Sequence, residues 1–399
     1  MRAVAAVLPI LLMLAVLASA EEVSVKLTTV SGKTLSGALS FADGSFKVTG
    51  RDTNETVKGE LVDRIDLPPY LEMPEDAYHC AVMTRHGDVF DGYFADLALE
   101  DAVAFSVPSF GYVDIQWTSL KGVMFYGLKR SKSEETALKD RIMSADPELD
   151  EIGLANGDVL NGAVIEIASR GALAEVNGKH LSIPAEELRY VIFAKLEETE
   201  PDTVWHCGVR TTFNNYFKMT ISSIAEGKLK GKMMAGDEVT IGLEKIVSIE
   251  FFNGAAIRLT TLKPSAVEYK PFFHKSWPWK LNKSVSGGPL RMKGKTWQEG
   301  IGTHSYTKLD YKLDGGFTDF TAVVGIDDGA GGKGSVVFRV LGDGKTLFET
   351  PVMKSGSVEA IRASVTDVEI LSLVTDYGGD DDLGDHGNWC DPKLIRKVE

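Results

Sequence analysis

A short run near the C-terminus combines several side chains that could bind a ligand. Residues 385–389 read Asp-His-Gly-Asn-Trp, which places a carboxylate, an imidazole, an amide and an indole within five positions. The polar groups can hydrogen-bond hydroxyls, and an indole can pack on the C–H face of a pyranose ring. The residues that we expect to contact a carbohydrate are His304, Asp328, Asp385, His386, Asn388 and Trp389.

Several of these residues also have a purely structural interpretation. His304 can hold a loop by hydrogen-bonding to the backbone, and Asp328 belongs to an Asp-Asp-Gly run that is typical of turns. Trp389 can cap the end of a β-sandwich, and we expect one tryptophan of the Trp-Pro-Trp segment at 277–279 in the core. The sequence leaves both interpretations open.

Aspartates are concentrated in the same part of the chain, since six of them lie between Asp376 and Asp391. Calcium takes about six to eight oxygen ligands from carboxylates and carbonyls. The candidate ligands of a structural calcium ion are Asp376, Asp380 and Asp382. The run lacks the spacing of an EF-hand loop, so a solvated acidic loop is the alternative.

Three segments occur in an order and spacing that resemble the NPCBM family of carbohydrate-binding modules. They are GIGTH at 300–304, VGIDD at 324–328 running into GSVVF, and GDHGNW at 384–389. The resemblance covers about residues 265–396. It implies a galactose-binding-like β-jelly-roll and a sugar-binding surface, with a galactose-type sugar as one option. The chain departs from the family pattern at Gly387, Asn388 and Cys390, and these departures bear on the identity of the ligand more than on the fold.

The rest of the chain is also expected to be β-rich. Valine, threonine and aromatic residues cluster in short runs between Gly, Asp and Asn. A hexapeptide that begins and ends with glycine recurs at 32–37, 87–92 and 157–162, and a degenerate fourth copy begins at Trp205. We interpret each copy as a bent five-strand meander that closes into a small barrel, weakly resembling SH3-like or Sm-like folds. We expect neighbouring units to pack together, because each is small.

This reading predicts an all-β protein with a β-barrel array followed by a jelly-roll. Residues 21–127 hold two repeats, 128–150 form a charged linker or a short helix, and 151–260 hold two further repeats. The jelly-roll module occupies 265–399. Cys80 and Cys207 stand in matching contexts, so they either form a disulfide or occupy equivalent buried strand positions.

The N-terminus predicts export from the cytoplasm. Residues 1–20 contain Arg2, an apolar run and Ala-Ser-Ala, as in a cleaved signal peptide. We therefore expect a secreted or periplasmic protein, with no membrane span after cleavage. The net charge of −14 argues against nucleic acid as a partner.

Common catalytic motifs are missing from the sequence, which has no H-E-x-x-H, no G-x-S-x-G and no P-loop. The first hypothesis is therefore a non-catalytic protein that binds a glycan or polysaccharide, with the repeats as a spacer or interaction platform. Two alternatives remain open. The repeats could degrade a polysaccharide to which the module targets them, or the protein could be an envelope scaffold that binds envelope proteins and no sugar.

Overall fold

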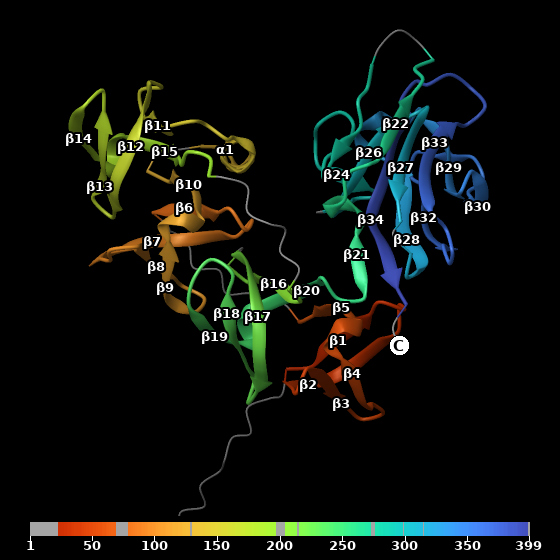
Figure 1. Ribbon diagram of the computed structural model, residues 1–399, viewed down its shortest axis with the longest axis horizontal. Helices are drawn as coiled ribbons and strands as arrows, with labels where there is room; N and C mark the ends of the chain where they lie inside the picture. The colour runs from red at the N-terminus through yellow and green to blue at the C-terminus, as the bar shows by residue number, and fades with distance from the viewer. Residues whose placement is uncertain are drawn as a thin grey trace, which may run out of the picture.

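The computed structural model describes residues 23–68, 79–127, 130–196, 204–213, 215–272, 276–297, 299–313 and 315–397. The predicted signal segment 1–20 lies outside these residues. The described part is built from β-strands, with a single α-helix (Figure 1). No helix there is both long enough and apolar enough to cross a membrane. The all-β prediction is confirmed.

Four units of five strands make up the N-terminal part. Unit 1 has β1 (Val25–Thr29), β2 (Thr34–Ala42), β3 (Ser45–Thr49), β4 (Asn54–Lys58) and β5 (Val62–Asp66). Unit 2 has β6 (Cys80–Thr84), β7 (Val89–Ala98), β8 (Ala102–Val107), β9 (Gly111–Gln116) and β10 (Leu120–Phe125). Unit 3 has β11 (Asp150–Leu154), β12 (Val159–Ala168), β13 (Gly171–Val176), β14 (Lys179–Pro184) and β15 (Leu188–Ile192). Unit 4 has β16 (His206–Thr211), β17 (Tyr216–Ala225), β18 (Lys228–Met233), β19 (Glu238–Gly242) and β20 (Ile246–Phe252).

The strand pairing is the same in all four units. The first strand pairs with the second and with the fifth, and a 3-10 turn precedes the fifth strand. The glycine inside the second strand permits this curvature. A Cβ at Gly92 would lie 2.1 Å from the carbonyl oxygen of Ser106, and one at Gly162 would lie 2.1 Å from that of Glu175. Only glycine lets the second and third strands approach so closely.

The units associate in pairs that do not follow chain order. Units 2 and 3 join through β10 and β15, whereas unit 1 joins unit 4 through β5 and β20 (Figure 1). The expectation that sequence neighbours pack together therefore holds for units 2 and 3, while unit 1 pairs with the most distant copy. One continuous apolar core runs through all four units.

The segment between units 2 and 3 contains helix α1 (Lys132–Ser144). Ser131 caps its N-terminus by accepting a hydrogen bond from the Glu134 amide, and the Glu134 carboxylate accepts one from the Ser131 amide. Leu138 and Ile142 then pack on Met124 and its neighbours in the sheet. The helix thus covers the outer face of the junction between units 2 and 3.

The C-terminal part is a sandwich of two sheets. The first sheet has the order β23-β26-β34-β28-β32 with β21 also paired to β34, and the second has β22-β27-β33-β29-β30 with β31 paired to β29. The separate hairpin β24–β25 packs on the first sheet through Leu290, Met292 and Cys390. The bounds are β21 (Ala256–Arg258), β22 (Ala266–Tyr269), β23 (Lys280–Leu281), β24 (Leu290–Met292), β25 (Lys295–Trp297), β26 (Gly300–His304), β27 (Thr307–Lys312), β28 (Phe317–Ile326), β29 (Ser335–Gly342), β30 (Lys345–Glu349), β31 (Met353–Lys354), β32 (Val358–Ser364), β33 (Ile370–Tyr377) and β34 (His386–Arg396).

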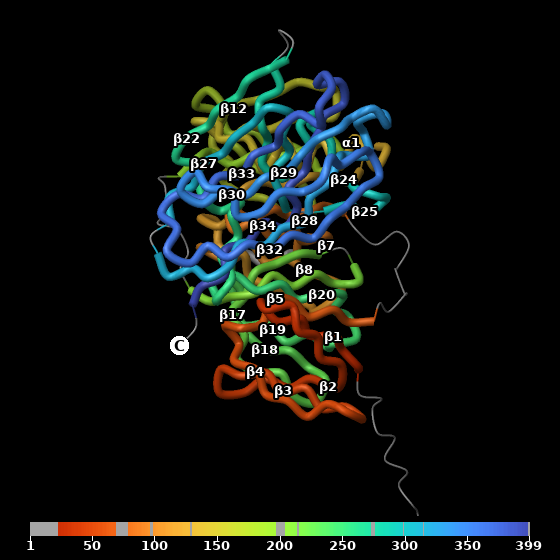
Figure 2. Tube along the Cα trace, turned by 90° about the vertical axis from the view of Figure 1, so that its right-hand side faces the viewer, coloured from red at the N-terminus to blue at the C-terminus, as the bar shows by residue number. Residues whose placement is uncertain are grey.

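The sandwich is docked on the repeats. The Lys393 ammonium donates to both carboxylate oxygens of Asp63, at 2.7 and 2.8 Å, and Lys283 of the sandwich lies 3.3 Å from Asp140 of helix α1. Figure 2 shows units 1 and 4 together at the lower end, with the sandwich extending away from them. The protein is therefore an assembly with a defined junction between repeats and sandwich.

The cysteines do not form a disulfide in this structure. Cys80, Cys207 and Cys390 are all free and buried. Cys80 opposes Gly92 in unit 2, and Cys207 opposes Met219 at the same step of the meander in unit 4. The two residues thus occupy equivalent buried strand positions, which was the alternative to a disulfide.

Candidate functional site

Three aromatic rings meet at the end of the sandwich where β26 ends and β34 begins. The Trp277 ring stacks on His304, with centroids 5.4 Å apart and planes 8° apart, and it lies 5.1 Å from the His386 ring. His304 is buried beneath this contact, whereas Trp277 and His386 are half-buried. We call these three residues the aromatic cluster. Its outer members present ring surface of the kind that can pack on a sugar.

The register of the sheet brings the two histidines together. His304 is the last residue of β26 and pairs with His386, the first residue of β34. Two positions 82 residues apart in sequence thereby become neighbours on one sheet edge, and their ring centroids lie 5.6 Å apart. The sequence predicted both as binding residues, and the structure places them in one cluster.

Asp385 precedes His386 of the aromatic cluster, and its side chain is fully buried. One of its carboxylate oxygens accepts a hydrogen bond from the Ser305 hydroxyl at 2.5 Å, and the other accepts one from the Ser335 amide at 2.8 Å. Burial raises the pKa of Asp385 to about 6, against the opposing effect of these two hydrogen bonds. Asp385 thus orients the loops around the cluster, and its burial contradicts a direct contact with a ligand.

Asn388 and Trp389 were also predicted to contact a sugar, but both side chains are buried. Residues from 386 onward belong to β34, which is hydrogen-bonded to β26 on one side and β28 on the other, so this run is not a loop. The Trp389 ring lies in the sandwich core, 5.1 Å from the Phe338 ring, and its Nε1 donates to Thr375. Asn388 donates to Asp327 at 2.8 Å.

Asp328 holds the hairpin β24–β25. Its carboxylate accepts hydrogen bonds from the backbone amides of Lys293 at 2.9 Å and Gly294 at 2.8 Å. These bonds stabilise the turn that covers the outer face of the first sheet. The side chain is exposed, so a contact between Asp328 and a sugar stays a prediction.

The three aspartates predicted to bind calcium have different surroundings in the structure. Asp376 forms an ion pair with Arg339, Asp380 accepts a hydrogen bond from the Ser335 hydroxyl, and Asp382 is buried. Across the described ranges, no three His, Cys, Asp or Glu side chains are grouped so that they could hold a metal ion. A structural calcium ion at Asp376, Asp380 and Asp382 therefore stays a prediction.

Sequence reasoning missed the most important aromatic residue of this surface. The sequence predicts that one of Trp277 and Trp279 is a core residue, and Trp279 is the one that packs against the sandwich core. Trp277, which lies in the aromatic cluster, is not among the predicted binding residues. Beside the cluster, the exposed ring of Phe272 lies 5.7 Å from the Tyr377 ring. The concentration of aromatic residues between 269 and 279 was the available signal, although only the fold shows which rings reach the surface.

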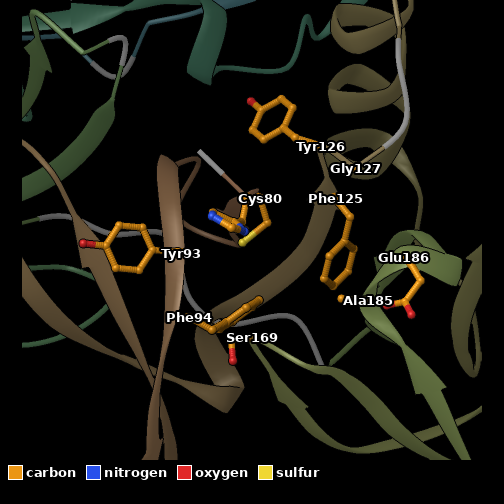
Figure 3. A pocket seen from close by; sticks show the side chains of 10 residues that line it. Cys80, Tyr93, Phe94, Phe125, Tyr126, Gly127, Ser169, Ala185 and Glu186 are labelled. Atoms are coloured by element: carbon orange, nitrogen blue, oxygen red, sulfur yellow. The ribbon is translucent and has the colours of Figure 1, made fainter. Parts of the chain in front are cut away.

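A cavity of about 420 Å³ lies between units 2 and 3 (Figure 3). Figure 3 shows Ala185 and Glu186 of unit 3 beside the Phe125 ring of unit 2, with Tyr93 on the opposite side and Cys80 between them. Burial raises the pKa of Cys80, so this thiol stays protonated at neutral pH and is not an activated nucleophile. The cavity is lined mainly by aromatic rings, together with the polar side chains of His79, Ser169 and Glu186.

Comparison with known proteins identifies the C-terminal module. Residues 260–395 match the family model described as the NPCBM/NEW2 domain. A Renibacterium salmoninarum protein provisionally named endo-alpha-N-acetylgalactosaminidase is 34% identical over 110 residues, which are 27% of this chain and 7% of that protein. Alpha-1,3-galactosidase B of Akkermansia muciniphila is 32% identical over 117 residues, 28% of this chain and 15% of that protein. The chain therefore spans only a small part of the length of either relative.

Among solved structures, this chain is similar to that of CBM51 from Clostridium perfringens GH95 in complex with methyl-galactose. The two are 25% identical, with a TM-score of 0.32, over 35% of this chain and 99% of that one. By the family match, residues 260–395 of the present protein, about a third of its length, are an NPCBM/NEW2 domain that follows four five-stranded β repeats.

Proposed function

We propose that this chain is a secreted, non-catalytic glycan-binding protein whose module binds a galactose-type sugar at the aromatic cluster. The observation that carries the proposal is the half-buried pair Trp277 and His386, which lies at the loop end of an NPCBM/NEW2 domain. An indole face can pack on the apolar side of galactose, and the imidazole can hydrogen-bond its hydroxyls. The two relatives named as galactosidase and galactosaminidase support a galactose-type ligand.

The acidic loop supports the same location. The exposed residues Asp380 and Asp381 follow β33 and precede His386, and the loop is tied to the β29 strand through Ser335. Carboxylates beside an aromatic surface are the usual partners of sugar hydroxyls. In this proposal, the hydrogen bonds of buried Asp385 to Ser305 and Ser335 hold the acidic loop in place, and the aromatic cluster contacts the sugar.

The first test is a glycan array with the full chain, run with calcium and with a chelator. Trp277→Ala should abolish binding to the galactose-type glycans that the wild type retains, because it removes the packing surface. Tyr112→Ala in unit 2 is the control, since Tyr112 is an exposed aromatic residue (68%) remote from the cluster in sequence. Binding that survives Trp277→Ala would refute this location, and the chelator arm tests the calcium prediction directly.

The non-catalytic part of the proposal needs its own measurement, because the relatives are named as enzymes. We expect no release of reducing sugar from a panel of polysaccharides, even with substrates that the module binds. Turnover by the full chain would instead support the alternative in which the repeats degrade a polysaccharide. A chain that binds envelope proteins but no glycan would support the scaffold alternative.

A further inference from the structure

A second cavity lies where the module meets the repeats, far along the sandwich from the aromatic cluster. Its volume is about 480 Å³, and its walls come from β5 of unit 1, β16 and β20 of unit 4, and β21, β25 and β34 of the module. That volume is typical of small-molecule sites, which measure about 300–1,000 Å³. Because three separate parts of the chain build the walls, the cavity exists only in the assembled protein.

The carboxylates of this cavity already have cationic partners. Glu299 accepts a hydrogen bond from buried Arg258 at 3.0 Å, and Asp63 and Asp391 both bind the buried ammonium of Lys393. The carboxylate of Asp66 pairs in the same way with Arg64 of the same strand, at 2.6 Å. The negative charge on the walls is thus balanced within the protein.

The groups that remain unmatched are all donors or cations. Within the described residues, the buried Nε of Arg258 and the buried Nε1 of Trp297 have no acceptor. The guanidinium of Arg210 lies over the Tyr216 ring at 5.2 Å and forms no ion pair with a carboxylate of the described residues. The Lys295 ammonium lies 3.6 Å from the centre of the Trp297 ring. A buried donor without an acceptor is unfavourable, so this cavity favours a ligand that supplies acceptors and negative charge.

We propose that this cavity is a second carbohydrate site that binds a carboxylated sugar, such as a uronic or sialic acid residue. The sugar carboxylate pairs with Arg210 and Lys295, and its ring and hydroxyl oxygens accept from Trp297 Nε1 and Arg258 Nε. The Trp297 ring packs on Leu290, Met292 and Cys390 and carries the Lys295 ammonium over its face, so its contribution to the site is the Nε1 donor. Arg258 stays in place through Glu299 and therefore presents its free Nε–H in a fixed direction.

The site goes beyond the galactose-type site of the aromatic cluster and does not depend on it. A ligand here contacts unit 1, unit 4 and the module at once, so its binding stabilises their junction as well as the fold. The two sites together would let one protein hold a neutral and an acidic part of the same glycan.

The test is thermal unfolding and calorimetric titration of the full chain with D-glucuronic acid, D-galacturonic acid and N-acetylneuraminic acid. D-Glucose and D-galactose are the neutral partners, and sodium acetate is the matched simple anion. We expect at least one acidic sugar to raise the melting temperature and to bind at least tenfold more tightly than its neutral partner or acetate. Equal effects of acetate would mean an anion site without sugar recognition, and equal effects of neutral sugars, or no effect at all, would overturn the proposal.

Variants locate the effect. Arg210→Gln should weaken the acidic sugar at least tenfold, while Lys230→Gln, an equal change of charge at an exposed position of β18, should leave it unchanged. If Arg210→Gln alone lowers the melting temperature of the free protein, Lys295→Gln on the exposed hairpin provides the same test. Trp277→Ala should keep the acidic-sugar response, and loss of that response in Trp277→Ala would assign the binding to the aromatic cluster instead.

Discussion

At the residue scale, the tryptophan that looked most suited to sugar binding is a core residue. Trp389 is fully buried between Phe320 and Phe338, and its Nε1 is satisfied by Thr375. Trp389→Ala should therefore lower the free energy of unfolding by about 3–5 kcal/mol, as for other buried aromatic residues. Urea denaturation measures this change.

Trp277→Ala provides the comparison, because Trp277 is only half-buried and its loss should cost much less stability. If the Trp389→Ala protein unfolds at the same urea concentration as the wild type but no longer binds sugar, Trp389 has a binding role rather than a packing role. The two variants thus separate a packing role from a binding role.

The buried carboxyl of Asp385 should make stability depend on pH. Its pKa is raised to about 6 from 3.8, so between these values the folded protein holds the proton more tightly than the unfolded chain. The contribution of Asp385 to stability is therefore largest below pH 4 and falls as the pH rises to 6, by at most about 3 kcal/mol.

Asp385→Asn should remove this fall, because the amide does not titrate, although it weakens the hydrogen bonds to Ser305 and Ser335. Melting temperatures between pH 4 and pH 7 measure the effect. Asp367→Asn, at an exposed position, is the control and should follow the wild type. An unchanged pH slope in Asp385→Asn would show that another group is responsible.

At the element scale, the barrel units depend on the glycine inside their second strand. A Cβ at Gly162 would meet the Glu175 carbonyl oxygen at 2.1 Å, so Gly162→Ala must push the second and third strands of unit 3 apart. We expect a loss of about 1–3 kcal/mol, the usual range for overpacking. Gly127→Ala is the control, because a Cβ there meets nothing within 4 Å. Equal urea midpoints for the two variants would contradict the close-approach explanation.

At the scale of the whole molecule, a buried ion pair joins the module to unit 1. Lys393 is almost fully buried, and removing its ammonium would leave Asp63 without its ion-pair partner and Asp391 with only Arg258, 3.5 Å away. Breaking such a pair by removing one partner costs about 3–5 kcal/mol. Lys393→Met should therefore loosen the junction, which small-angle X-ray scattering would record as a larger radius of gyration.

Lys345→Met, an exposed substitution on β30, should leave the radius unchanged. A compact Lys393→Met protein would mean that the remaining contacts, such as Lys283 with Asp140, are enough to hold the module on the repeats. The same junction forms the second cavity, so the variant should also weaken the proposed acidic-sugar site.

The sequence by itself determined the architecture of this protein. Glycine-bounded hexapeptides revealed the repeated units, because hairpin turns and close strand crossings require glycine at fixed spacings. The three NPCBM segments identified the module, and the match at 260–395 confirms that resemblance. These signals are local, so they can be read without knowing how distant parts of the chain meet.

Only the tertiary structure decided which residues face solvent and which units join. Both faces of β34 are covered, one by the sandwich core and the other by the hairpin β24–β25, so the side chains of Asn388 and Trp389 are buried whatever their chemistry. The pairing of unit 1 with unit 4 and the cavity at their junction with the module likewise arise from contacts between residues far apart in the chain. Burial and docking depend on what covers each surface, and a linear pattern of residue types does not carry that information.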